Sequence, residues 1–362
     1  MPPNPTKDPD GRYRRLRNAN RFVVLGLVAF STLAIGTVHP WTRAVLFAGT
    51  AASFLILLVS NRRVERRLLI AAPLWTLCAA FVLTLLQLVP LPAGVVRALS
   101  PHAHEIFMTT MGSYDLHALS LDPAGTLHEL AKLGAYATFF ALASTYFGYT
   151  DKRRMVTVTL LALATLVAVL GLVQRALDSP HLLFLYQPTA TWGNSVRGTF
   201  VNPNHFGALV TLGAPCALVL ALTDHRLRWW AVASLIVLNV AVLLSLSRSG
   251  IISTGVGQLV AAALVWAYRH RGESAGRHSK LFAAGVATTV LLAIAVTVLV
   301  SFSALKPQVE QMQHDISSGL RKAHAWQRST ELVGLYPWTG AGRGALEQAY
   351  TQVSDEGEHA RY

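Results

Sequence analysis

Long apolar runs, separated by short polar and basic segments, dominate this chain from about residue 22 to residue 302. Nine of these runs are long enough to cross about 30 Å of hydrocarbon as helices. They lie at 22–38, 44–60, 68–88, 133–147, 155–173, 206–222, 229–246, 251–267 and 281–302. The fourth run is expected to begin earlier, near Thr126. The pattern predicts an all-α, polytopic membrane protein with about nine transmembrane helices.

The distribution of Lys and Arg predicts how these helices are oriented. Five segments that would share one side hold 19 of the 31 basic residues, and the intervening segments and span edges hold six. Because basic residues favour the cytoplasmic side, the N-terminus is predicted to be cytoplasmic. Residues 1–21 then form a cytoplasmic tail, 22–302 the transmembrane domain, and 303–362 a segment on the outer face that begins with a helix over 307–332.

Composition agrees with a membrane protein, since 52% of the residues are hydrophobic and only 14% are charged. A soluble domain carries nearer a quarter of charged residues. The two cysteines, Cys78 and Cys216, lie inside apolar runs without metal-ligand spacing and are interpreted as small core side chains.

Few polar side chains lie within the predicted spans. Gln87, Asn239 and Gln258 are expected to form hydrogen bonds between helices. An ion-coupled transporter usually needs an acidic side chain inside the membrane and often has inverted repeats. The spans contain neither, so a transporter is disfavoured.

The polar stretch 197–206, between two apolar runs on the predicted outer face, is the first candidate site. Asn202 followed by Pro203 is typical of a helix start, with a capping side chain and proline in the first turn. The free N–H groups at that helix end, together with Arg197, would bind an anion. Asn204 and His205 share the same first turn and belong to the predicted site. An ordinary capped interhelical loop is the alternative interpretation.

Arg248 is the second candidate, in the tight turn 245–250 between two spans on the same face. Its planar fork can hold two phosphate oxygens and stays charged. Two arginines and a helix N-terminus would suit a diphosphate. An arginine that only snorkels to the membrane interface is the alternative. The histidines show no zinc spacing, and the glycines in 336–344 follow no strand, so neither a metal site nor a nucleotide loop is favoured.

Three motifs in chain order resemble those of the O-antigen ligase and polymerase superfamily of bacterial membrane glycosyltransferases. They are Arg-Gly-Thr-Phe-Val-Asn-Pro-Asn-His-Phe at 197–206, Ser-Arg-Ser-Gly at 247–250 and Tyr-Pro-Trp-Thr-Gly-Ala-Gly at 336–342. Arg197 and Arg248 match the arginines thought to bind the carrier diphosphate in that family.

The resemblance implies a multi-pass protein of the bacterial inner membrane. Its activity would be transfer of a glycan from an undecaprenyl-diphosphate carrier to an acceptor hydroxyl at the periplasmic face, where 303–362 would begin a large loop. The acceptor is the lipid A core in ligases and a second carrier-linked glycan in polymerases. Membrane lipids are the surroundings, and neither a metal, another cofactor nor nucleic acid is implied.

One departure concerns a family motif in which a histidine is followed by asparagine. His359 is followed by Ala360, and the sequence ends at Tyr362, so the motif is expected beyond it and the catalytic base stays unassigned. We therefore expect residues 1–362, as a truncated piece of a longer protein, to bind the carrier glycan weakly without transferring it. A lipid-linked glycan transporter and a non-catalytic membrane scaffold are the alternative functions.

Overall fold

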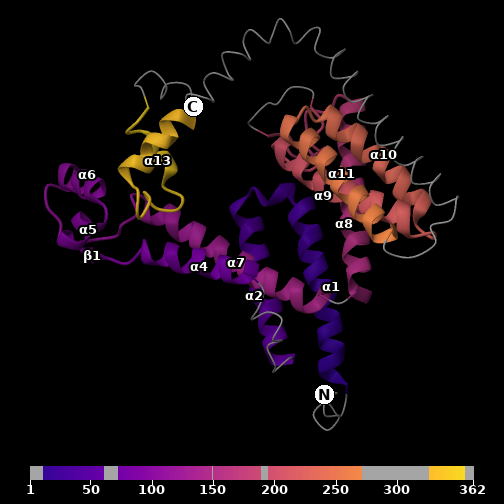
Figure 1. Cartoon of the computed structure of the whole chain (residues 1–362), viewed down its shortest axis with the longest axis horizontal. Coiled ribbons are helices and arrows are strands. Elements are labelled where there is room, and N and C mark those ends of the chain that lie inside the picture. The colour runs from indigo at the N-terminus through magenta and orange to yellow at the C-terminus, as the bar shows by residue number, and fades with distance from the viewer. Residues whose placement is uncertain (1–10, 61–71, 149, 189–194, 271–325, 355–362) are drawn as a thin grey trace, which may run out of the picture. The chain divides into compact units, whose positions relative to one another are not determined.

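A computed structural model describes residues 11–60, 72–148, 150–188, 195–270 and 326–354. The chain divides into two compact units (Figure 1). The first unit takes the described parts of 1–61 and 146–306, and the second takes those of 62–145 and 307–362. Each unit is described by itself.

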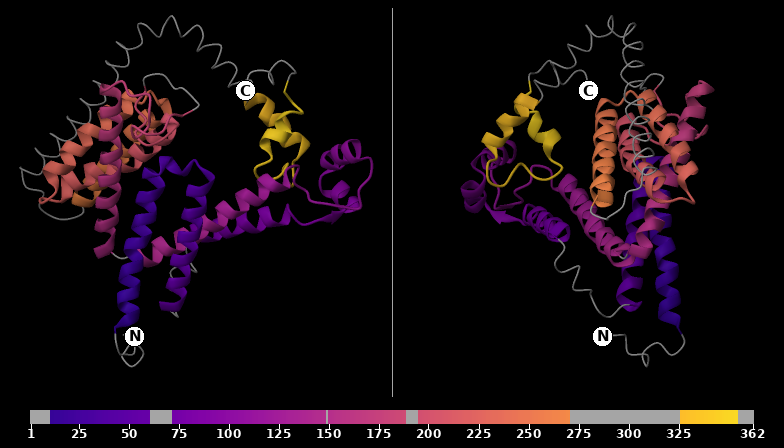
Figure 2. Two further views of the ribbon diagram at one scale, coloured as in Figure 1. Left: turned by 180° about the vertical axis from the view of Figure 1, so that it is seen from behind. Right: turned by 45° about the vertical axis from the view of Figure 1, so that its right-hand side comes forward.

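The first unit is a helical bundle in which α9 (Pro203–Thr223) lies at the centre. It packs against α8 (Thr150–Ala176), α10 (Arg228–Leu244) and α11 (Arg248–His270), which lie side by side in Figure 2. In α9, 61% of the apolar stretch is buried inside the protein, whereas in α11 only 22% is. Glycine allows the close approach, because a Cβ added at Gly207 would lie 3.0 Å from the Cα of Gly250.

The other helices in the described part of this unit are α1 (Arg12–Leu33) and α2 (Pro40–Ser60), joined by the 3₁₀ turn η2 (Ile35–Thr37). The first predicted span was placed at 22–38, but α1 ends at Leu33. Ile35, Gly36 and Thr37 all have positive φ, which is incompatible with a continuing helix. The side chain of Asn20 donates a hydrogen bond to the hydroxyl oxygen of Tyr146, 2.8 Å away, which also belongs to this unit.

Two sets of contacts mark the opposite ends of the bundle. At one end, Arg154 at the start of α8 forms an ion pair with Asp224, which follows α9, with 2.8 Å between Nη2 and Oδ2. At the other end, the N–H of Val196 donates to the carbonyl of Leu244 at 2.9 Å. α8, α9 and α10 thus run up, down and up between the two ends, as consecutive spans must.

The second unit contains α4 (Ala72–Leu86), α5 (Ala93–Leu99), α6 (Pro101–Met111), α7 (Pro123–Phe147) and the short α13 (Leu346–Tyr350). Residues 326–335 are also helical. Strands β1 (Leu91–Pro92) and β2 (Leu116–His117) pair antiparallel, with Leu91 opposite His117. The segment after α4 and the tail share one core, made of Val96, Ala103, Phe107, Leu119, Leu332, Tyr336 and Ala349.

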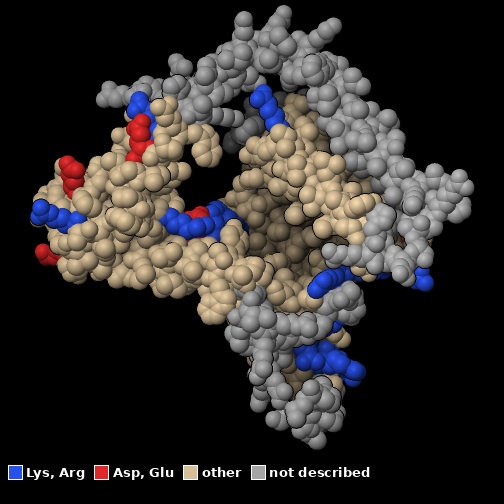
Figure 3. All heavy atoms as spheres, in the orientation of Figure 1, with Lys and Arg blue, Asp and Glu red and all other residues tan. Residues whose placement is uncertain are grey.

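The mostly helical, membrane-type architecture agrees with the prediction, but the count of nine spans is not confirmed. Four helices in the described part are long and apolar enough to cross a membrane: Pro40–Ser60, Lys152–Ala176, Pro203–Thr223 and Arg248–Tyr268. Two shorter apolar helices, Ala72–Leu86 and Arg228–Leu244, lie at other predicted spans. The predicted span 281–302 and most of the predicted helix 307–332 fall outside the described residues. Charged side chains are sparse on the face drawn in Figure 3 and gather in small patches.

The polar side chains inside the predicted spans behave in two ways. Gln258 of α11 donates to the side-chain oxygen of Asn239 in α10 at 2.9 Å, so this interhelical pair is confirmed. The interhelical role expected for Gln87 is wrong. Because α4 ends at Leu86, Gln87 lies at the helix terminus and instead binds the tail. Its amide donates to the carbonyl of Thr339 at 2.7 Å and accepts from the N–H of Arg343 at 3.0 Å.

Candidate anion-binding site

Helix α9 begins where the sequence predicts. Asn202 is the N-cap, with extended backbone angles, and its side chain accepts a hydrogen bond from the N–H of Asn204 at 2.8 Å. Pro203 occupies the first helical position, where a missing N–H costs nothing. The cap satisfies one of the free N–H groups of the first turn and fixes the direction in which the chain enters α9.

Helices α9 and α11 begin side by side, which brings several predicted site residues to one place. The hydroxyl of Ser247 donates to the side-chain oxygen of Asn204 at 2.7 Å and accepts from the N–H of Gly250 at 3.2 Å. Arg248 is the first residue of α11, and both Arg248 and His205 are exposed. The starts of the two helices therefore present a basic side chain and an imidazole on the same end of the bundle.

The segment that carries Arg197 is held firmly on both sides. Gly198 has φ +59°, and a Cβ added there would lie 2.6 Å from the carbonyl oxygen of Val167 in α8. Only glycine combines this left-handed conformation with so close an approach to a helix backbone. On the C-terminal side, the hydroxyl of the fully buried Thr199 donates to the carbonyl of Thr32 at 2.6 Å. Together with the hydrogen bond from Val196 to Leu244, these contacts fix the position of Arg197.

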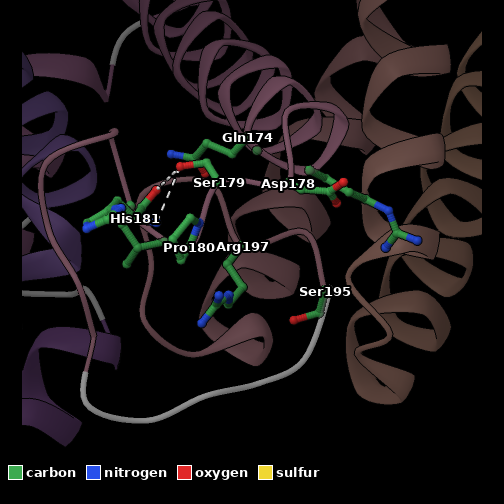
Figure 4. A pocket seen from close by; sticks show the side chains of 10 residues that line it. Gln174, Asp178, Ser179, Pro180, His181, Ser195 and Arg197 are labelled. Carbon is green, nitrogen blue, oxygen red and sulfur yellow. Dashed lines mark hydrogen bonds between the residues drawn. The ribbon is translucent and has the colours of Figure 1, made fainter.

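Arg197 lines a cavity of about 210 Å³ at the end of α8 (Figure 4). At about 30 Å³ for each water molecule, this is room for roughly seven waters, enough for a phosphate group. Besides Arg197, the cavity is lined by Gly171, Gln174, Arg175, Asp178, Ser179, Pro180, His181, Leu182 and Ser195. In the close view, Arg197 and Ser195 lie on the side opposite Gln174 and Ser179.

The charge of Arg197 is not matched within the described residues. Its Nη1 atom is buried there without a hydrogen-bond partner. Burial lowers the pKa of the guanidinium, but an arginine stays protonated in proteins. A partly buried cation with an unused donor is stabilised by an anion that accepts from it.

The other polar groups of the cavity adjust what it can bind. Arg175 donates from Nη1 to the carbonyl of Leu244 at 3.2 Å, so it helps to close the cavity at the end of α10. The two arginines, Arg175 and Arg197, and the single carboxylate of Asp178 together leave one formal positive charge in the cavity lining. The hydroxyl of Ser179 and the backbone of His181 bond to each other at 3.3 Å, which shapes the turn after α8.

The structure divides the predicted site into two places. Arg197 lines the cavity, whereas Arg248, Asn202, Asn204 and His205 do not. The side chains of Asn202 and Asn204 are engaged in holding the starts of α9 and α11.

The sequence analysis missed six polar residues that line the cavity: Gln174, Arg175, Asp178, Ser179, His181 and Ser195. The available signal was the basic residue Arg175, which ends an apolar run on the predicted outer face. Nothing in the sequence indicated that it would lie beside Arg197.

A comparison with known families covers part of the predicted site. The model of the O-antigen ligase family matches residues 232–361. This confirms the predicted resemblance to the O-antigen ligase and polymerase superfamily. The matched region includes α10, Arg248 and the turn 336–344, while Arg197 and the start of α9 precede it. No curated protein and no solved structure matches the chain.

Proposed function

We propose that this protein is a membrane glycosyltransferase of the O-antigen ligase or polymerase type. It would transfer a glycan from an undecaprenyl-diphosphate carrier to an acceptor hydroxyl at the periplasmic face of the bacterial inner membrane. The lipid A core or a second carrier-linked glycan would be the acceptor. The observation that carries the proposal is Arg197, a partly buried guanidinium whose buried Nη1 has no hydrogen-bond partner among the described residues, in a cavity large enough for a phosphate.

The chemistry makes clear why fixed positive charge is needed. The acceptor oxygen forms a bond to the anomeric carbon, and the bond from that carbon to the phosphate oxygen breaks. The electron pair of this bond leaves with undecaprenyl diphosphate, while the acceptor hydroxyl loses its proton to a general base. Negative charge grows on the leaving phosphate, and a preorganised guanidinium stabilises that charge more than it stabilises the substrate.

The surroundings of Arg197 support this role. Gly198 and Thr199 hold the segment against α8 and α1, so the backbone that carries Arg197 is fixed at the edge of the cavity. A charged donor held in place before the reaction avoids reorganisation at the moment when charge develops. Arg248, in the matched region, is proposed to add a second positive charge where α9 and α11 begin, with His205 and the capped start of α9 beside it.

Glycan transfer in cells, with each substitution made in a full-length parent protein, tests this proposal. Arg197→Ala is expected to reduce transfer at least tenfold, since a hydrogen bond between charged groups contributes about 1.5–3 kcal/mol. Arg197→Lys should restore little activity, because a point charge does not reproduce the planar fork. Arg248→Ala should also lower transfer. The matched control is Arg97→Ala, which removes an exposed arginine at the end of α5.

All four variants must accumulate in the membrane at comparable levels for the comparison to be valid. Normal transfer by Arg197→Ala would refute the proposed role of the cavity. A loss of transfer in Arg97→Ala as large as that in Arg197→Ala would also contradict the proposal, since any lost arginine would then have the same effect.

A further inference from the structure

The turn 336–344 carries an unusually exposed tryptophan. Trp338 is 89% exposed, and its neighbours on both sides are fixed to the rest of the second unit. Tyr336 is buried in the core that the tail shares with α5 and α6. On the other side, the carbonyl of Thr339 accepts a hydrogen bond from Gln87 at 2.7 Å. Because the backbone on both sides is fixed, the exposed indole of Trp338 is held in a position where it can contact something outside the unit.

The height of this turn along the paired helices α4 and α7, which lie at two of the predicted spans, can be worked out from contacts. A Cβ added at Gly134 of α7 would lie 3.4 Å from the ring of Phe81 in α4, so these residues mark one level of the paired helices. Gln87 follows Phe81 by six residues, which is about 9 Å at 1.5 Å per residue. The turn bound by Gln87 therefore lies about 9 Å above that level, at the end of α4.

The charged side chains of the paired helices begin just below this height, since Lys132 and Glu129 lie about 3 Å and about 8 Å above Gly134 at 1.5 Å per residue. α4 contains no Asp, Glu, Lys or Arg, and α7 has none from Leu133 to Phe147. The first charged residues above that stretch are Lys132 and Glu129, which form an ion pair, and Arg343 of the turn lies 3.5 Å from Glu129. The boundary between the uncharged and the charged part of the helix pair thus coincides with the turn.

Exposed apolar groups lie just below this boundary. Leu83 and Leu86 of α4 are 64% and 54% exposed, and Tyr136, one helical turn below Lys132, is 54% exposed. Trp and Tyr are enriched at membrane–water interfaces, where the ring contacts the acyl chains and the polar atom reaches the headgroups. Lys and Arg prefer the same layer.

We propose that the turn 336–344 lies in the headgroup layer of the membrane, with Trp338 inserted between the lipids. The partner is the phospholipid surface of the membrane that α4 and α7 enter. Arg343 and Lys132 both pair with the carboxylate of Glu129, which places two basic side chains at the turn, in the layer that Lys and Arg prefer. The tail is thereby attached to the membrane surface as well as to Gln87.

Spin labels in the protein reconstituted into phosphatidylethanolamine–phosphatidylglycerol liposomes test this placement. Cys78 and Cys216 are first replaced by alanine, and a nitroxide is then attached at Trp338→Cys. Accessibility to oxygen and to a water-soluble nickel chelate reports the depth of the label. Trp338 is exposed, so its replacement leaves the core intact. The reference sites are Leu83→Cys, exposed on α4, and Thr351→Cys, exposed in the tail.

The label at 338 is expected to lie between the two references in depth, with at least threefold lower nickel accessibility than the label at 351. A label at 338 that is as open to nickel as the label at 351 would place the turn in water and overturn the proposal. A label that is closed to both oxygen and nickel would indicate a protein partner in place of lipid and would equally overturn it.

Discussion

Replacing Gln87 by alanine removes the side-chain amide that attaches the turn 336–344 to the end of α4. This amide donates to the carbonyl of Thr339 and accepts from the N–H of Arg343, both more than 250 residues later in the chain. Its own carbonyl accepts from the N–H of Ser120 at 3.1 Å, and this backbone bond survives the substitution. Gln87→Ala therefore removes two hydrogen bonds without removing the helix end that carries them.

The expected magnitude follows from those two bonds. Each hydrogen bond contributes about 1 kcal/mol net, so the turn 336–344 loses about 2 kcal/mol of local stability. At 25 °C this raises the equilibrium constant for local opening roughly 30-fold. The N–H of Leu121, which donates to the carbonyl of Ala341 at 2.9 Å, is the best reporter, because the substitution leaves its own acceptor in place.

Hydrogen exchange of the protein in nanodiscs, followed by mass spectrometry, measures this opening. Peptides that contain Leu121 should exchange roughly 30-fold faster in Gln87→Ala, whereas peptides from α9 should be unchanged. The matched control is Gln348→Ala, which removes one exposed hydrogen bond to Asp122. Its effect should stay below threefold. Unchanged exchange at Leu121 in Gln87→Ala would refute the argument that Gln87 holds the tail.

Three further predictions concern the first unit. Gly250→Ala should destabilise the protein by about 1–3 kcal/mol, because the added Cβ would lie 2.9 Å from the backbone of α9. Gly255→Ala, which adds a Cβ in open space, should have no such effect, and thermal melting in detergent compares the two variants. Asn202→Ala removes a helix cap worth about 1 kcal/mol and should lower the melting temperature by ~2–4 °C. The hydrogen bond with Arg154 lowers the pKa of Asp224 in the folded protein. The ionised Asp224 therefore stabilises the fold fully above the unfolded pKa of about 4, and this stabilisation is lost as the pH falls through the lower folded pKa. Asp224→Asn should abolish this part of the pH dependence of the melting temperature.

Local signals in the sequence predicted the helices and several of their ends. Asn202 and Pro203 predicted the start of α9 because capping depends on adjacent residues alone. The tight turn that contains Arg248 was also predicted from nearby residues, because the two apolar runs on either side leave almost no residues between them. The end of α1 was misplaced because Ile35 and Thr37 adopt positive φ, which their side chains give no reason to expect.

Long-range packing decided what the sequence could not predict. The cavity places Arg197 beside the end of α8, and that arrangement depends on the fit of Gly198 against the carbonyl of Val167. Gln87 was expected to pair with a helix, yet it binds a turn some 250 residues later. No periodicity or spacing encodes such a contact, because it results from the fold of the whole second unit.

Binding of undecaprenyl diphosphate to the purified protein in nanodiscs, measured by native mass spectrometry, tests the central claim most directly. The protein is expected to retain the lipid diphosphate, with affinity at least tenfold weaker in Arg197→Ala than in Arg97→Ala. Inorganic pyrophosphate should compete for the same site. Equal affinity in the two variants would contradict the claim that the cavity lined by Arg197 binds the carrier diphosphate.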